Sequence, residues 1–352
     1  MRRKLVALAM VVGAAGALMS APASAEQPVV VTSSANRGPG SLRAALATGA
    51  TQISIAPDVG TINLRSPVNW SGRSLLLAGT GQAVDGNGAV GTLLTLRTTQ
   101  VQISGMTFRD TAGSAIRVVV PRSATGTATV DLTDVTVEDT ALHGVHIDDL
   151  AGSSASVQLR TTDVVVSSAG IGESDQDGVR VDERGEGHII FSSIDSMYEH
   201  SGADGVELDE GGPGDVVFDL SNSKFLHNGP LDPADLDDGI DVDEADAGSI
   251  QARITQSTFD HNYDEGIDLN ELGPGDVNAL LTSVTVVDTV DGDGLQVDEE
   301  DAGNVAVSVA SSTLVDNDGD DIDLDQGDAG TGVFRLRDST VGSINLDGVT
   351  QL

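Results

Sequence analysis

The strongest constraint on this chain is a seven-residue pattern that recurs through its second part. The pattern is Asp-Gly-Φ-x-Φ-Asp-Glu, in which Φ is an aliphatic residue. It occupies, with some variation, residues 143–149, 177–183, 204–210, 238–244, 265–271, 293–299 and 320–326. From one glycine position to the next the spacings are 34, 27, 34, 27, 28 and 27 residues. This periodicity predicts stacked structural units.

Each unit contains three short segments typical of β-strands. After Gly214, for example, alternating apolar residues cover 216–220, a second segment covers 223–226, and a third covers 240–242. Three strands per unit predict a triangular coil. The aliphatic residues Val145, Val179, Val206, Ile240, Ile267, Leu295 and Ile322 should then stack inside one continuous parallel sheet.

The second strand gives an independent check on the register. A large apolar residue recurs there and should form an inward ladder: Phe108, Val137, Tyr198, Phe225, Phe259, Val286 and Leu314. Two residues later stand Asp110, Asp139, His200, His227, His261, Asp288 and Asp316. Asn228, Asn262 and Asn317 follow three of these, and we expect them in the left-handed region of a tight turn.

The chain begins with features of a secretory signal. Arg2, Arg3 and Lys4 precede an apolar run over 5–18, and Ala23-Ser24-Ala25 offers a cleavage site. The run is too short and interrupted for a membrane anchor. We expect a signal peptide over 1–25, an N-terminal strand and capping helix over 26–50, and a β-helix over 51–352. The acidic repeats run from about residue 131 to 330.

The negative charge of the chain limits the classes of molecule that it can bind. The chain has 55 acidic and 18 basic residues, and 51 of the acids lie beyond residue 130. Such a charge repels nucleic acid and anionic lipid, so neither nucleic-acid binding nor membrane insertion after signal removal is expected, and divalent cations are the natural partners. There are no cysteines, so the exported chain forms no disulfides. We expect a monomer that is secreted or held in the cell envelope.

With these repeats, the chain resembles the pectin-lyase-like superfamily of single-stranded right-handed parallel β-helices, as found in bacterial exported and surface proteins. The segment from Gly38 to Leu46 also resembles the short helix that caps the first coil in such proteins. Ser41 would be its N-cap and Gly49 its C′ residue. Further strands are expected at 53–55, 62–64 and 75–77.

The resemblance implies a possible activity, since many members cleave or epimerise acidic polysaccharides. Lyases of this architecture use a Lys or Arg base near calcium-binding acids, whereas the hydrolases use clustered carboxylates. This sequence departs from both patterns: beyond the signal Lys224 is its single lysine, and the dipeptide His143-Gly144 is no more than a chance match. Aromatic platforms for sugars are also scarce, with one Trp and two Tyr. No catalytic residue is predicted.

The acidic ladder is the strongest chemical signal. Because both Φ positions face the core, the residue between them and the following Asp should face outward, and the final Glu should lie at the turn. Coils stack about 4.8 Å apart, so like charges would repel strongly unless cations or raised pKa values relieve them. Calcium fits this ligand chemistry. The predicted calcium ligands are Glu207, Asp209, Glu210, Asp241, Asp243, Glu244, Asp268, Asn270, Glu271, Asp298, Glu299, Asp323 and Asp325. A solvated acidic face that only maintains solubility is the alternative.

Three other features remain open. His200, His227 and His261 should lie on successive coils, either as a polar turn ladder or as a transition-metal site such as zinc. Lys224 should point outward, as a lone base or as a surface lysine. The insertions at 168–176 and 228–237 should project from the same edge, as binding loops or as tolerated insertions.

The sequence therefore favours a secreted or cell-surface, calcium-binding β-helix protein with a binding, adhesion or structural role. A polysaccharide or a cell-surface ligand is a further candidate partner. The alternative is a polysaccharide-active enzyme, that is, a lyase, hydrolase or epimerase acting on acidic polysaccharide. The small number of aromatic residues and the lack of a recognisable Lys or Arg catalytic base favour the non-enzymatic interpretation.

Overall fold

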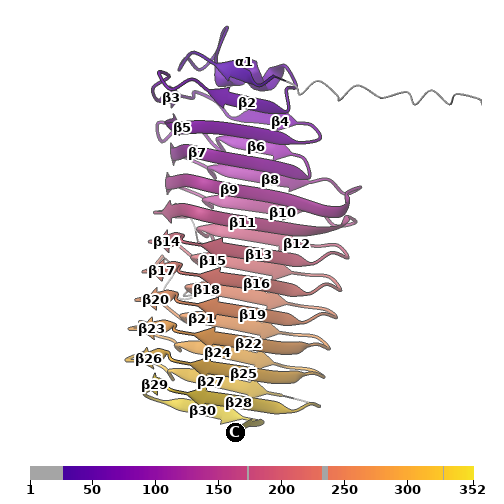
Figure 1. The fold of residues 1–352 in the computed structure, drawn as a ribbon, viewed down its shortest axis with the longest axis vertical. Coiled ribbons are helices and arrows are strands. Elements are labelled where there is room, and N and C mark those ends of the chain that lie inside the picture. The colour runs from indigo at the N-terminus through magenta and orange to yellow at the C-terminus, as the bar shows by residue number, and fades with distance from the viewer. Residues whose placement is uncertain (1–26, 173, 232–236, 328) are drawn as a thin grey trace, which may run out of the picture.

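The structure is a computed structural model that describes residues 27–172, 174–231, 237–327 and 329–352. The proposed signal peptide lies outside the described residues. The chain winds into a stack of coils, with the helix α1 (Leu42–Ala47) at one end and the C-terminus at the other (Figure 1). All strand pairings with the preceding and following coils are parallel. This confirms the predicted fold class, a parallel β-helix.

One side of the coil is an 11-stranded sheet that contains all seven repeats of the sequence pattern. Its strands are β4 (Val68–Ser71), β6 (Leu94–Arg97), β8 (Ile116–Val120), β10 (Val145–Asp149), β12 (Val179–Glu183), β15 (Val206–Glu210), β18 (Ile240–Glu244), β21 (Ile267–Glu271), β24 (Leu295–Glu299), β27 (Ile322–Gln326) and β30 (Ile344–Asp347). The seven aliphatic residues predicted to stack inside this sheet are all fully buried, so the predicted register is confirmed.

The other two sides belong to a 20-stranded sheet. Toward the N-terminus its strands are β1 (Val29–Val31), β2 (Gln52–Ile55), β3 (Ile62–Asn63), β5 (Leu75–Asp85), β7 (Gln100–Thr111), β9 (Thr125–Thr140) and β11 (Ser154–Ser167). Later coils divide the same path into two strands: β13 (Ile189–Ile194) and β14 (Met197–Glu199), β16 (Val216–Ser221) and β17 (Lys224–Leu226), β19 (Ile250–Thr255) and β20 (Thr258–Asp260), β22 (Asp276–Thr282) and β23 (Thr285–Val287), β25 (Asn304–Ala310) and β26 (Thr313–Val315), β28 (Gly332–Arg337) and β29 (Thr340–Val341), with β31 (Val349–Gln351) last.

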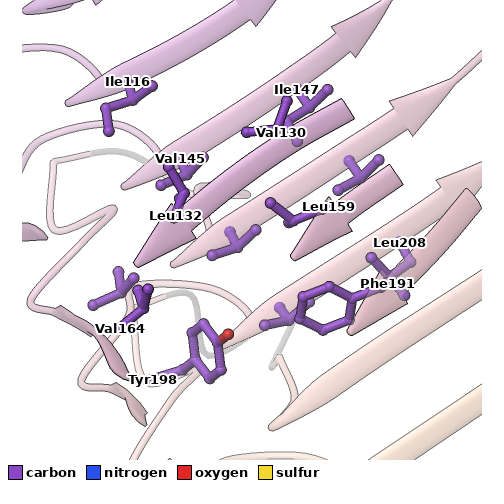
Figure 2. Packing of buried hydrophobic residues seen from close by; sticks show 14 of the residues in the cluster. Ile116, Val130, Leu132, Val145, Ile147, Leu159, Val164, Phe191, Tyr198 and Leu208 are labelled. Carbon is purple, nitrogen blue, oxygen red and sulfur yellow. The ribbon is translucent and has the colours of Figure 1, made fainter. Parts of the chain in front are cut away.

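The core is a continuous column of apolar side chains between these sides (Figure 2). The predicted second ladder is confirmed, because Tyr198, Phe225 and Phe259 are fully buried and stack with ring centroids 5.0 and 4.6 Å apart. The buried hydroxyl of Tyr198 is satisfied by Thr161 at 2.8 Å and Ser193 at 3.0 Å. Burial of this column supplies the main stabilisation in a chain without disulfides.

The predicted turn residues are displaced by one position. His200, His227 and His261 adopt the left-handed conformation, each with φ of 56°. Asn228 and Asn262, which were expected there, are fully buried and form a ladder in which the Asn228 side-chain amide donates to Asn262 Oδ1 at 3.0 Å. The amide satisfies backbone groups of the turn, a role that an imidazole in the same place would not fill.

The N-terminal cap is confirmed. The hydroxyl of Ser41 accepts a hydrogen bond from the Ala44 N–H at 3.2 Å, and Gly49 has a φ of 75° after the C-cap residue Thr48. The helix covers the open end of the first coil, with Leu42 and Leu46 buried. Within the described ranges no helix is long and apolar enough to cross a membrane.

Candidate metal centre

The outward positions of the 11-stranded sheet form the files that the repeat predicts. Glu207 pairs with Asp241, which pairs with Asp268. A second file runs beside it through Asp209, Asp243 and Asn270, and both files continue to Gln296 and Asp323, and to Asp298 and Asp325. The first acid of one repeat, Asp238, turns toward these files, and three carboxylates converge: Asp238, Asp241 and Asp268 offer oxygens that all lie within 4.8 Å of one another.

The carboxylates of this trio have fewer hydrogen-bond donors than they have oxygens. Asp238 and Asp268 are 6% and 8% exposed. The Oδ1 atoms of Asp241 and Asp268 are buried and have no hydrogen-bond partner. Asp268 Oδ2 accepts from the Asn270 side-chain amide at 2.8 Å, and Asp238 Oδ1 accepts from the Glu265 N–H at 2.7 Å. The trio therefore presents unpartnered carboxylate oxygens to a shared space, which a hard cation prefers as ligands.

The electrostatics of the trio are unfavourable without a counter-ion. Burial, and then Glu265, raise the pKa of Asp268 to about 8. Burial raises the pKa of Asp238 and of Asp241 well above the ordinary carboxyl value, and neighbouring acids, including Asp268, raise each further. Protons or a cation must therefore offset this charge.

Toward the N-terminal side of the trio, an arginine neutralises the same files. Arg180 is 16% exposed and contacts five carboxylates: Asp182 at 2.8 Å, Asp175 at 3.1 Å, Asp209 at 3.4 Å, Asp177 at 3.5 Å, and Glu207. Burial opposes its charge, but Glu207 and Asp177 hold the pKa of Arg180 above its usual value. Burial, and then the neighbouring acids Asp177 and Asp204, raise the pKa of Glu207, while the contact with Arg180 opposes this rise.

Two histidines extend this arginine cluster by one coil. His146 Nε2 lies 2.7 Å from Asp182 Oδ2, and the Asp177 N–H donates to His143 Nδ1 at 3.0 Å. The two imidazole centroids are 4.8 Å apart. Burial opposes ionisation of Asp182, but hydrogen bonds from His146 and Arg180 lower its pKa.

The sequence prediction missed this cluster, although its register contains the signal. His143 and Asp177 share the first position of the repeat, while His146, Arg180 and Glu207 share the fourth. Residues at the same position of consecutive repeats stack on one another. These two positions therefore bring the five side chains together on neighbouring coils.

The final glutamates lie at the ends of their strands, where the turn begins, but their side chains point inward and not toward the solvent. Glu210, Glu244 and Glu271 are fully buried and Glu299 is 1% exposed, so their carboxyl groups lie in the interior beside the turn. The alternation of the strand explains this: the third and fifth positions face inward, and the seventh continues the same side. We therefore confine the calcium ligand set considered below to Asp238, Asp241 and Asp268, and leave out these four glutamates and the other predicted ligands.

The remaining predicted features are placed as follows. His200 stacks on His227 with centroids 5.1 Å apart, and His227 lies 5.0 Å from His261. Lys224 is exposed, as expected. The insertions begin on coils that flank the same intermediate coil, since the Gly202 N–H donates to Ala169 O at 2.7 Å and the Leu231 N–H donates to Gly202 O at 3.2 Å.

Comparison with known proteins supports the fold. No protein-family model matches the sequence, and no curated protein matches it significantly. Among solved structures, a crystal structure of pectate lyase Pel9A aligns with a TM-score of 0.53 and 14% identity, covering 80% of this chain and 78% of the lyase. The ORF18 protein of Geobacillus virus E2 aligns with a TM-score of 0.52 and 12% identity, covering 89% of this chain and 60% of the viral chain. The catalytic unit of a GH87 α-1,3-glucanase from Streptomyces thermodiastaticus aligns with a TM-score of 0.48 and 13% identity, covering 93% and 71%.

At these identities a structural likeness concerns the backbone and not the chemistry of a site. The shared features are the parallel coils and the stacked interior, which this chain builds from its own repeats. The protein is thus a parallel β-helix with the pectin-lyase-like fold.

Proposed function

We propose that this protein is an exported calcium-binding β-helix, which acts outside the cytoplasm in binding, adhesion or support. The observation that carries the proposal is the carboxylate trio of Asp238, Asp241 and Asp268, with its buried unpartnered oxygens. The remaining acids of the outward files surround the trio with negative potential and would concentrate cations at the face. Its binding partner would be a polysaccharide or a cell-surface ligand, held directly or through the ions.

Calcium suits the trio better than other common cations do. The donors are all oxygens, which excludes a preference for soft metals. Calcium accepts six to eight oxygen ligands in flexible geometry, so three carboxylates from adjacent strands and added water can satisfy it. Magnesium requires near-ideal octahedral geometry and gives up its water reluctantly. Asn270 stands where the neighbouring repeats have Asp, and its amide orients Asp268 through the hydrogen bond to Oδ2.

The proposal is tested by thermal unfolding in millimolar calcium, against sodium chloride of equal ionic strength. A cation that binds the native state alone raises the melting temperature with its concentration. The calcium-specific increment should disappear in Asp241→Asn and persist in Asp219→Asn, a matched change at an exposed acid of β16. If calcium stabilises the protein no more than sodium does, the acidic face is only a solvated surface and the proposal is wrong.

A polysaccharide-active enzyme remains a second candidate because of one observation. Arg180 and His146 lie among Asp177, Asp182 and Glu207, where the pKa of Asp182 is lowered and that of Glu207 is raised. Environments that separate two carboxyl pKa values in this way are typical of acid–base pairs. The likeness to a pectate lyase suggests uronic-acid polymers as the first substrates to try. Unsaturated products or shortened chains that require His146 would support the enzyme, and their absence over the panel would leave the binding role.

A further inference from the structure

The interior of the β-helix contains a file of six acidic side chains, which we call the interior carboxyl file. It occupies the seventh position of the repeat on consecutive strands of the 11-stranded sheet. Its members and their exposed fractions are Asp149 0%, Glu183 0%, Glu210 0%, Glu244 0%, Glu271 0% and Glu299 1%. A carboxylate in such a place loses its hydration, and a file of them is strongly unfavourable if all are ionised.

From Asp149 to Glu271, the carboxyl groups of neighbouring members come within hydrogen-bonding reach of one another. The carboxyl group of Glu210 lies within hydrogen-bonding reach of those of Glu183 and Glu244, and Glu244 in turn reaches Glu271. Asp149 reaches Glu183, while Glu271 and Glu299 pair in register. Two ionised carboxylates are acceptors only, so each contact needs a proton to become a hydrogen bond.

Backbone donors satisfy only part of the file. Glu183 accepts from the Gly185 N–H at 3.0 Å, Glu271 accepts from Gly273 at 3.1 Å, and Glu210 accepts from Gly212 at 3.1 Å and from Gly214 at 3.3 Å. Both carboxyl oxygens of Glu244 and of Asp149 are buried and form no well-aligned hydrogen bond, although the Asp246 N–H approaches Glu244 and the Ser153 side chain approaches Asp149. One oxygen each of Glu183, Glu271 and Glu299 is also buried without a hydrogen-bond partner.

The charged groups that bear on the file are themselves acidic. Apart from other members, Asp148 faces Asp149, Asp246 faces Glu244, and Asp276 and Asp301 face Glu299. Arg117, on the coil before the file begins, directs its guanidinium group to Asp148, and Arg184, next to Glu183, directs its guanidinium group to Asp148 and Asp182. In the part of the chain that the structure describes, no basic side chain forms an ion pair with a member of the file.

The last of the seven repeats shows how a neutral side chain satisfies this position. There the seventh position is Gln326, which is 6% exposed, and its amide donates to Glu299 Oε2. Gln is the neutral isostere of a protonated Glu, so this coil supplies permanently the donor that other coils lack. The fold therefore accepts a neutral side chain at this position.

We propose that the interior carboxyl file binds protons shared between neighbouring side chains, so that about three of its six members are neutral in the native protein near neutral pH. Three is the smallest number that leaves no two ionised neighbours in a linear file of six. The inference concerns the interior and is independent of the calcium proposal.

Alternate members are the natural carriers of these protons. Because Gln326 donates to Glu299, Glu299 can stay ionised, and the protons then fall on Glu271, Glu210 and Asp149. The pKa directions agree: burial first, and then contact with an acidic neighbour, raise the pKa of Asp149 to about 7, of Glu210 to about 9 and of Glu271 to about 8. For Glu244, burial raises the pKa, while hydrogen bonds from Glu271 and Glu210 favour its ionised form.

The proposal fixes the sign of a pH effect. A carboxyl group whose native pKa is raised contributes stability that is fully present below its unfolded pKa of about 4.3, and this stability is lost as pH rises through the native value. The interior carboxyl file should therefore lower the free energy of unfolding as pH rises from about 4.3 to 9. An ordinary ion-paired acid has the opposite effect, because it stabilises the native protein as pH rises.

The test is urea unfolding of the purified protein from pH 5 to 9, with a calcium chelator and constant ionic strength. It compares the unchanged protein with Glu210→Gln, Glu271→Gln and the control Glu300→Gln, which changes an exposed acid beside Glu299. Each file variant should lose the equivalent of about one proton from the slope of stability against pH. The control should keep the full slope. Calorimetry in two buffers of different ionisation heat should show that each file variant releases about one proton fewer on unfolding than the unchanged protein does.

Equal slopes in all four proteins would overturn the proposal, because the file would then bind no protons beyond those of the unfolded chain. A Glu210→Gln protein that fails to fold at pH 5 would also overturn it, since Glu210 would be neutral there and Gln has its shape. Stability of Glu271→Gln above that of the unchanged protein at pH 9 would support it.

Discussion

Inside the coil stack, the side-chain amide of Gln326 donates to the carboxylate of Glu299, and Gln326 Oε1 accepts the Val305 N–H at 3.0 Å. Both ends of this amide are thus used. The pair joins the last two full repeats and ends a column of buried acids with a neutral group. Gln326 therefore shows that a side chain at this position can take part in a hydrogen-bond ladder without carrying a negative charge.

Gln326→Glu should destabilise the protein in a pH-dependent way. The change removes the amide donor to Glu299 and adds an acid to the interior. Leaving a buried hydrogen bond unmade costs about 1–3 kcal/mol. The loss in the free energy of unfolding should be small at pH 5, where the new acid can be protonated, and should grow toward pH 9. Urea unfolding at the two pH values measures it, and a loss independent of pH would contradict the expectation.

Gly275→Ala should destabilise the turn between β21 and β22. A Cβ on Gly275 would lie 1.5 Å from the carbonyl oxygen of Gly248 on the preceding coil, and backbone cannot move aside as a side chain can. Overpacking of this kind costs about 1–3 kcal/mol. Gly60→Ala is the matched control, because a Cβ there meets nothing within 4 Å. Thermal unfolding should separate the two, and equal melting temperatures would show that neighbouring coils can shift apart.

Arg180→Gln should be among the most damaging surface changes. It removes the arginine shared by the buried carboxylates of Asp177 and Asp182, although Arg184 still contacts Asp182 at 2.7 Å. Breaking a buried ion pair costs about 3–5 kcal/mol. Arg160→Gln removes an exposed arginine that contacts Asp131 at 3.1 Å and should cost about 0–1 kcal/mol. Denaturant unfolding at pH 7 compares them, and a similar small loss in both would mean that the Arg180 cluster is hydrated and weak.

Calcium affinity should rise with pH. Calcium binds the ionised carboxylate, and burial with the nearby acid Glu265 raises the pKa of Asp268 to about 8. Binding must therefore release protons, and the dissociation constant should fall as pH increases from 6 to 9. Titration calorimetry at several pH values measures this change. A dissociation constant that is the same at pH 6 and pH 9 would show that the ligands are already ionised.

The fold could be predicted because each repeat contains two inward-facing apolar positions that lie on different sheets. Val206, Ile240 and Ile267 fix one sheet, and Tyr198, Phe225 and Phe259 fix another, so both had to satisfy the same coil length. A slip by one residue would have buried the outward acids and exposed these side chains.

The interior position of Glu244 and its equivalents was less accessible to sequence reasoning. The alternation of Ile240 and Val242 leads inward at Glu244, yet the expected cost of burying an acid argued for the turn. What outweighs that cost is the neighbouring acid on each side, which offers a proton to share, and no single repeat shows this. The presence of Gln326 at the same position was the available hint.

The left-handed turn shows a similar limit. Both His227 and Asn228 are polar and adjacent, and propensity favours Asn in the left-handed region. The structure places His227 there because Asn228 is needed inside, where its amide donates to the Tyr198 carbonyl at 3.3 Å. Local preference is outweighed by a hydrogen bond to the neighbouring coil.

The central claim is that Asp238, Asp241 and Asp268 hold a calcium ion. The most direct measurement is an anomalous difference map from crystals grown in millimolar calcium. It should show a peak about 2.3–2.6 Å from oxygens of all three carboxylates, and that peak should be absent in Asp241→Asn crystals. A trio that contains only water, while the crystals contain calcium, would contradict the claim.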